Sequence, residues 1–190
     1  MKKITHWAPF AAILLFPTAV LATVVIAETI EEMARASTMV VRGRIVQVQP
    51  QLEESSGRIY TYADIRVIEV LKGAKVGSVL VKQPGGVVGN RGMRVAGAGR
   101  FIEGQDSVLF LEDAPDEPGV FILRALAAGK IDLETSKKGE LKAVRHLGGL
   151  AFYGQQSDQN PLRRVQPEED FGTPEVFLSR LRSALGGADR

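Results

Sequence analysis

The stretch RIYTYADIRVIEVL, residues 58–71, decides the fold, because its side chains alternate between two kinds over most of its length. One face is apolar or small, and the other carries tyrosines and charges: the first comprises Ile59, Thr61, Ala63, Ile65 and Val67, the second Tyr60, Tyr62, Asp64 and Arg66. A period of two is typical of a half-buried strand. The apolar phase flips at Ile68 and Val70, which indicates a bulge or a sharp coil.

The segment before this strand repeats the pattern. Apolar or small residues alternate from Met39 to Ile45, and the phase then flips to Val46 and Val48, with Gly43 close by. Two long strands that each flip midway fit a strongly coiled sheet that closes on itself. Shorter strands are expected at 78–83, 107–111, 119–126, 130–133 and 140–144, of which 107–111 is apolar on both faces and therefore central. We predict a mainly β fold, a small closed antiparallel barrel spanning residues 23–153.

Two helices are expected beside the barrel. The first spans residues 29–36, where Thr29 and Glu32 have the spacing of a capping box. A polar linker at 154–172 leads to the second, an amphipathic helix at 173–187 that opens with Thr173-Pro174. Its apolar stripe consists of Phe177, Leu178, Leu181 and Leu185. We expect this stripe to pack on the domain, and the alternative is a helix that binds a partner.

The first 22 residues have the layout of a cleavable secretory signal. Lys2 and Lys3 precede an apolar run that ends at Ala22, and the alternative is a membrane anchor. The chain has 24 basic and 22 acidic residues, and removing the two lysines leaves 22 of each. We therefore expect a formally neutral periplasmic or secreted protein, which meets a membrane only through its signal during export. An exported neutral domain does not suggest nucleic-acid binding. A further hypothesis is an intracellular OB protein that binds nucleic acid, and cleavage of the signal would exclude it.

Reactive side chains are scarce in the exported part. The chain has no Cys, and His146 is the one histidine after residue 22. Because transition metals favour His and Cys ligands, we predict no metal site. The acidic turn near Asp116 lacks the spacing of an EF-hand, and the glycine loops at 84–89 and 97–104 lack the phosphate-binding patterns. We assign no catalytic residue and no cofactor.

Four segments carry a resemblance to a known group. They are the opening strand at 36–45, the end of the long strand with its Lys-Gly turn at 67–73, and the segments GSVLV at 77–81 and GQDSVLFL at 104–111. This pattern resembles bacterial exported proteins with a netrin-like or TIMP-like OB barrel, over about Thr38 to Leu126. The resemblance implies an OB or netrin-like barrel of uncharacterised function. Animal metalloprotease inhibitors of that fold bind the protease zinc through an N-terminal Cys, and this chain has none.

These observations favour an exported, non-catalytic binding module of the bacterial cell envelope, which interacts with a protein or another envelope component. Small barrels bind through loops and one strand face. The candidate surface joins the polar face of the long strand to the loop at 84–99, and its residues are Tyr60, Tyr62, Asp64, Arg66, Gly85, Gly86, Arg91 and Arg94. Ordinary cross-strand packing is the other interpretation of the tyrosines. The alternative function is a secreted hydrolase that uses carboxylates or His146.

Overall fold

The computed structural model describes residues 24–26, 28–147, 151–153, 162–163 and 168–186. The predicted signal at 1–22 and most of the predicted linker at 154–172 lie outside these ranges. No helix in the described ranges has the length and apolarity needed to cross a bilayer.

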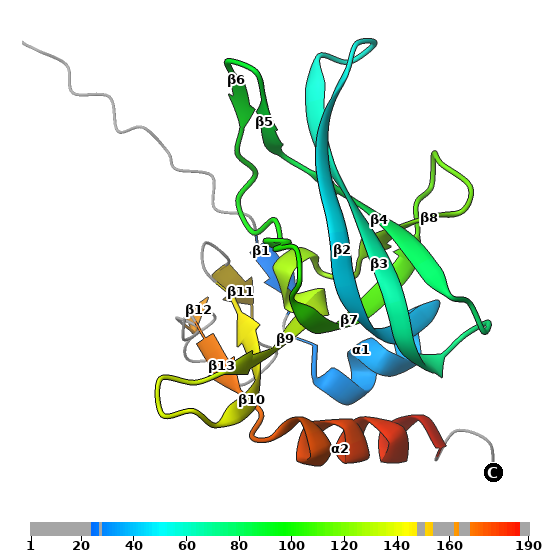
Figure 1. Ribbon diagram of the computed structural model, residues 1–190, viewed down its shortest axis with the longest axis vertical. Coiled ribbons are helices and arrows are strands. Elements are labelled where there is room, and N and C mark those ends of the chain that lie inside the picture. The colour runs from blue at the N-terminus through cyan, green and yellow to red at the C-terminus, as the bar shows by residue number, and fades with distance from the viewer. Residues whose placement is uncertain (1–23, 27, 148–150, 154–161, 164–167, 187–190) are drawn as a thin grey trace, which may run out of the picture.

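The fold is mainly β, with two helices, α1 (Ile30–Ala36) and α2 (Pro174–Gly186). Five strands form a partly ring-like arrangement, in the order β7 (Asp106–Asp113), β2 (Met39–Glu53), β3 (Arg58–Lys72), β4 (Ser78–Pro84) and β8 (Val120–Leu123), because β8 also pairs with β7. The expectation of an antiparallel sheet needs one correction here: β4 and β8 pair in parallel. The two helices lie at one end of this ring (Figure 1).

Further strands extend the sheet and flank it. Beyond β7 the order continues with β9 (Lys130–Thr135), β10 (Leu141–His146) and β13 (Glu168–Asp170). A two-stranded arm, β5 (Gly86–Val88) and β6 (Arg91–Met93), rises at the end of the ring away from the helices (Figure 1). A separate three-stranded sheet contains β1 (Val24–Ile26), β11 (Ala151–Tyr153) and β12 (Leu162–Arg163). A 3₁₀ turn, η1 (Leu126–Gly129), precedes β9.

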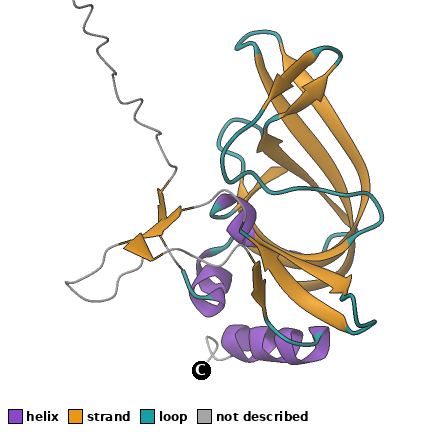
Figure 2. Ribbon diagram, turned by 90° about the vertical axis from the view of Figure 1, so that its left-hand side faces the viewer, coloured by secondary structure: helices purple, strands orange, loops and turns teal. Residues whose placement is uncertain are grey.

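The predicted irregularity of the long strands is present in the β2–β3 ladder. The register shifts between Ile45 and Gln47, where the apolar phase of β2 flips, and also between Arg42 and Gly43. Gly43 is needed at this point, because a Cβ there would lie 2.5 Å from Ile65 Cγ2 and 2.8 Å from the Arg66 carbonyl oxygen. The strands can therefore coil closely around the inside of the ring, as Figure 2 shows.

Two hydrophobic clusters lie on opposite faces of β2 and β7. Val41, Leu109 and Leu111 belong to the cluster inside the ring, whereas Val40 and Phe110 belong to the cluster under the helices. Adjacent residues of a strand point to opposite faces, so β7 and the first three residues of β2, Met39–Val41, are buried on both sides. The expectation that residues 107–111 form a central strand is confirmed by the complete burial of Val108, Leu109, Phe110 and Leu111.

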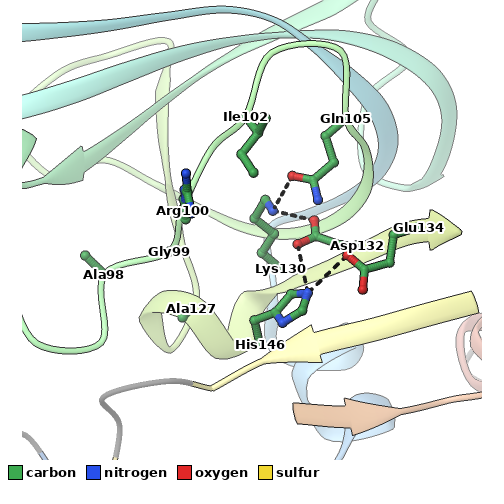
Figure 3. Close-up of a pocket in the computed structure, with 10 residues that line it drawn as sticks. All are labelled: Ala98, Gly99, Arg100, Ile102, Gln105, Ala127, Lys130, Asp132, Glu134 and His146. Atoms are coloured by element: carbon green, nitrogen blue, oxygen red, sulfur yellow. Dashed lines mark hydrogen bonds and ion pairs between the residues drawn. The ribbon is translucent and has the colours of Figure 1, made fainter. Parts of the chain in front are cut away.

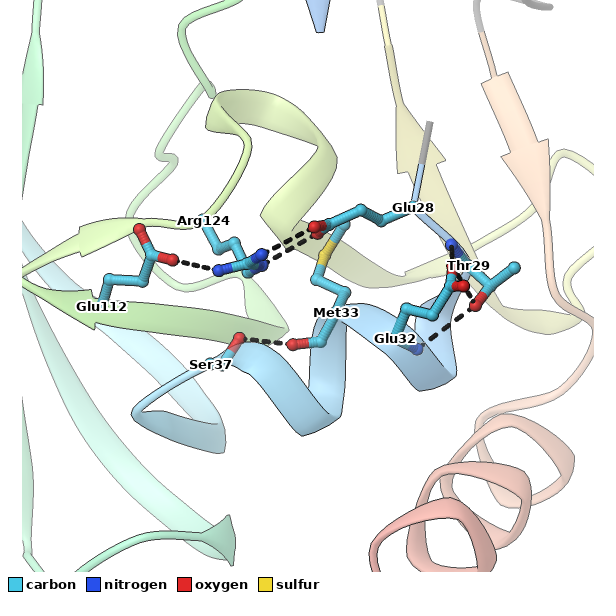
Figure 4. Close-up of polar contacts among 7 residues, drawn as sticks. All are labelled: Glu28, Thr29, Glu32, Met33, Ser37, Glu112 and Arg124. Carbon is cyan, nitrogen blue, oxygen red and sulfur yellow. Dashed lines mark hydrogen bonds and ion pairs between the residues drawn. The ribbon is translucent and has the colours of Figure 1, made fainter. Parts of the chain in front are cut away.

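Polar contacts hold both ends of α1 in place, and Figure 4 shows the capping box and the contacts of Arg124. The predicted capping box is present, since the Thr29 hydroxyl accepts from the Glu32 amide at 3.2 Å and the Glu32 carboxylate accepts from the Thr29 amide at 2.8 Å. Arg124, which follows β8, pairs with Glu28 at 2.6 Å and also with Glu112 of β7. At the other end, Lys72 Nζ donates to the carbonyl oxygens of three residues, Ala34, Arg35 and Ser37.

Replacing Lys72 with methionine is expected to lower the free energy of unfolding by about 1–2 kcal/mol, because three carbonyl groups at the end of α1 lose a charged donor. Urea unfolding followed by circular dichroism measures the change. The matched control is Lys75→Met in the exposed β3–β4 turn, which should change the free energy by less than about 0.5 kcal/mol. Equal effects of the two substitutions would show that Lys72 does not cap the helix.

Candidate functional site

The polar face of β3 lies on the outside of the ring, as its alternation predicts. Ile59, Thr61, Ala63 and Ile65 are buried, whereas Tyr60, Tyr62 and Asp64 are half-buried and Arg66 is exposed. The Lys82 ammonium of β4 sits over the Tyr60 ring at 4.4 Å and over the Tyr62 ring at 5.5 Å. Glu117, from the loop between β7 and β8, accepts from Lys82 at 2.9 Å and from the Tyr62 hydroxyl at 3.0 Å.

The outer face of β3 that carries Tyr60 and Tyr62, here called the tyrosine face, is stabilised by the opposite charges of Lys82 and Glu117. Desolvation is the largest influence on Lys82 and opposes the charged form, but hydrogen bonds with Glu117 and Tyr62 outweigh it and raise the pKa of Lys82. The hydrogen bond from Lys82 lowers the pKa of the Glu117 carboxyl. Both side chains are therefore charged at neutral pH, and with the Tyr62 hydroxyl they already form a connected set of polar contacts.

A groove of about 610 Å³ is lined by residues of the β5–β6 arm and of the loops that flank it. Gly85 and Gly86 form part of its wall. Their φ angles are 103° and 143°, which residues other than glycine rarely adopt. The buried Thr61 hydroxyl donates to the Gly85 carbonyl oxygen at 2.6 Å and so fastens the loop to β3. A Cβ on Gly86 would lie 2.7 Å from Thr61 Oγ1, so the chain can approach β3 this closely only with glycine.

The structure divides the predicted surface between these two places. Gly85, Gly86 and Arg94 line the groove. The four polar residues of β3 do not line it, and they occupy the opposite face of that strand from Thr61. Arg91 is exposed on β6 and is not among the residues of the groove wall.

A second hollow, a pocket of about 410 Å³, is lined by a group of titratable side chains that face one another. Lys130, Asp132 and Glu134 alternate along β9 and share one face, and His146 comes from the neighbouring strand β10 (Figure 3). His146 Nε2 lies 3.2 Å from Glu134 Oε2 and 3.9 Å from Asp132 Oδ2. On the other side of the imidazole, His146 Nδ1 lies 3.5 Å from Glu168 Oε1 of β13.

Lys130 and Asp132 form a buried ion pair at the base of this pocket. Their side chains are 4% and 6% exposed, and the Lys130 ammonium also donates to Gln105 Oε1 at 3.2 Å. The buried hydroxyl of Ser107 donates to Asp132 Oδ1 at 2.7 Å, so the same oxygen accepts from both donors. Burial lowers the pKa of Lys130, and the charge of Asp132 opposes this effect.

The groove and the pocket share one wall. Ala98, Gly99 and Arg100 line both of them, and Gly99 is packed so closely that a Cβ would lie 2.9 Å from Leu123 Cδ1. The loop between β6 and β7 thus separates a mainly apolar groove from a charged pocket. A molecule bound in one hollow would contact the wall of the other.

Sequence reasoning identified His146 but missed its neighbours. A single histidine without cysteine gave no reason to expect ligands. Asp132 lies in the strand predicted at 130–133, whereas Glu134 lies just beyond its predicted end, in the longer strand that the structure has. The signal that was present is the i, i+2 spacing of two carboxylates, which places both on one face of a strand. The pairing of β9 with β10, and of β10 with β13, then brings those carboxylates and Glu168 to the imidazole.

The pocket places an imidazole between carboxylates, and groups of these two kinds can accept and donate protons in acid–base chemistry. Ser107 is completely buried and does not line the pocket, so its hydroxyl is not available to a substrate there.

No model of a known protein family matches the chain, and no curated protein matches it.

Proposed function

We propose that this protein is an exported, non-catalytic binding module of the bacterial cell envelope, built on a closed barrel of OB or netrin-like type. The ring order β2-β3-β4-β8-β7, with its single parallel pair between β4 and β8, supports the OB-type barrel. We further propose that the module is periplasmic or secreted after loss of residues 1–22.

The observation that carries the proposal is the composition of the groove at the β5–β6 arm. Its wall is largely apolar, with Val48, Val87, Met93, Val95 and Phe101 among its members. It also contains two cations, Arg94 and Arg100, and no acidic residue. Val87 is 65% exposed, so an apolar side chain at the rim is available to a partner.

An extended segment of a protein, with apolar side chains and at least one carboxylate, fits this groove. Its apolar groups would cover Val87 and Met93, and its carboxylate would pair with Arg94 or Arg100. Among the described strands, β5 and β6 pair only with each other, so their outer edges offer backbone groups to an added strand. Recognition would combine backbone hydrogen bonds, apolar contact and charge.

Selection of peptides from a random display library on the immobilised protein tests this function. We expect the selected peptides to be enriched in an acidic residue flanked by apolar residues. The double variant Arg94→Glu/Arg100→Glu should weaken their binding at least tenfold, because two attractive charges become repulsive. The matched control, Lys137→Glu/Lys138→Glu in the exposed β9–β10 turn, should bind as the unmodified protein does.

Two results would contradict the assignment to the groove. One is a failure to enrich any peptide family. The other is binding that the arginine variant retains and that Tyr60→Ser/Tyr62→Ser abolishes, because the site would then be the tyrosine face.

A secreted hydrolase is the second candidate function, and the position of His146 between carboxylates at a pocket favours it. Turnover of ester, peptide or glycoside substrates that the His146→Ala variant lacks would support this candidate. Activity that this variant keeps would exclude His146 from the chemistry.

A further inference from the structure

The second hollow has a property that peptide binding in the groove does not use. Three potential metal ligands, Asp132, Glu134 and His146, each offer one atom within 4.8 Å of the other two. One nitrogen and two carboxylate oxygens are a donor set that zinc and similar first-row cations accept. All three side chains line the pocket, so a fourth coordination position would face its interior.

The distances between the donor atoms suit a bound cation. Zinc lies about 2.0–2.2 Å from nitrogen and carboxylate oxygen, so the donor atoms of a tetrahedral site are about 3.4 Å apart. The imidazole Nε2 lies 3.2 Å from the Glu134 oxygen and 3.9 Å from the Asp132 oxygen, on either side of that value. Small rotations of half-exposed side chains are enough to close the difference.

The buried carboxylate of Asp132 is the second, independent indication of a ligand. It is 5% exposed, and both hydrogen bonds that it accepts from described residues, Lys130 and Ser107, reach the same oxygen, Oδ1. The other oxygen, Oδ2, faces the imidazole at a distance greater than a hydrogen bond. The protein thus holds a carboxylate rigidly and leaves one oxygen of it directed at the pocket (Figure 3).

The surroundings also supply orientation and charge. Glu168 lies on the far side of the imidazole, 3.5 Å from Nδ1, where a carboxylate that accepts from Nδ1 would favour the tautomer that presents Nε2 to a metal. Three carboxylates and one lysine, Lys130, give a net charge of about −2 around the imidazole. The charge of Arg100 is on an exposed side chain at the rim. A divalent cation would balance the interior charge.

We propose that Asp132, Glu134 and His146 form a binding site for one divalent first-row cation, typified by Zn²⁺, with Glu168 as a positioning residue. The open fourth position faces the pocket and is free for water or for an anionic group. This site is separate from the peptide groove, although Ala98, Gly99 and Arg100 line both hollows.

Calorimetric titration of the protein with Zn²⁺ tests the site, using a purification tag without histidine. We expect one zinc per chain. Glu134→Gln should weaken binding at least tenfold and His146→Gln at least a hundredfold, because each removes a ligand. Glu168→Gln should weaken it by about 10–100-fold, the usual effect of an outer partner of a ligating histidine. The three side chains are at least 39% exposed, so these variants should fold, which circular dichroism verifies.

A control separates this site from adventitious binding. Glu140→Gln removes an exposed carboxylate of the β9–β10 turn. This variant should bind zinc as the unmodified protein does. The ¹⁵N resonances of the His146 imidazole should show that zinc coordinates Nε2 rather than Nδ1. No zinc binding up to millimolar concentration, unchanged binding by His146→Gln, or coordination through Nδ1 would each overturn the proposal.

Discussion

Replacing Asp132 with asparagine is expected to lower the free energy of unfolding by about 3–5 kcal/mol, measured by urea denaturation in the presence of EDTA. The change leaves the Lys130 ammonium buried without a counter-charge, since its side chain is 4% exposed. Asparagine keeps an oxygen for the Ser107 hydroxyl, so the loss reports the missing charge rather than a missing acceptor. A loss of this size is a large part of the 5–15 kcal/mol that stabilises a typical domain.

A second substitution identifies the cause of that loss. The double variant Lys130→Met/Asp132→Asn contains neither buried charge, and methionine retains much of the apolar stem of lysine. It should recover at least half of the stability lost by Asp132→Asn, because an unpaired buried charge costs more than a neutral pair. The matched control is Glu134→Gln on the same strand face, whose side chain is 39% exposed and which should cost at most about 1 kcal/mol.

The opposite result would be equally informative. If Asp132→Asn and Glu134→Gln had similar small effects, the Lys130–Asp132 pair would be hydrated in solution. The double variant would then be less stable than Asp132→Asn alone.

Replacing Phe177 with alanine is expected to cost about 3–5 kcal/mol, because a large aromatic side chain leaves a cavity in the core. Phe177 is 1% exposed and belongs to the cluster that contains Ile30 and Met33 of α1. Its ring also lies 5.3 Å from that of Phe171, measured between the ring centroids. Urea or thermal unfolding measures the change.

The adjacent residue provides the control. Val176 is 62% exposed on the same helix, so Val176→Ala should change the free energy of unfolding by less than about 0.5 kcal/mol. A helix that served only to bind a partner would show small effects at both positions. The burial of Phe177, Leu178 and Leu181 instead agrees with the expectation that the apolar stripe packs on the domain.

Features with short sequence separation could be predicted well. The two faces of β3 follow from strict alternation, because successive side chains of a strand point in opposite directions. The capping box of α1 follows from Thr29 and Glu32, which meet within one helical turn. The register shifts at Val46 of β2 and at Ile68 of β3 follow from the changes of apolar phase, because a buried face cannot change side without an irregularity in the pairing.

Features that join distant segments could not be predicted in the same way. Lys72 reads as part of a turn in the sequence, but it donates to the end of α1, 35–38 residues away. Strand β13 lies in a segment that reads as a polar linker, because Glu168 and Asp170 give no apolar pattern. Its pairing with β10 brings Glu168 to His146.

By itself, the sequence determined the mainly β class, the two amphipathic helices and the face on which each long strand is buried, because these depend on periodicities of two and of 3.6 residues. Only the tertiary structure decided that β4 and β8 pair in parallel, that the glycine loop closes a groove over Thr61, and that Asp132 and Glu134 face His146. Each of these contacts joins residues from different strands. Their formation depends on how the whole sheet coils and pairs, and no local pattern of residues specifies that geometry.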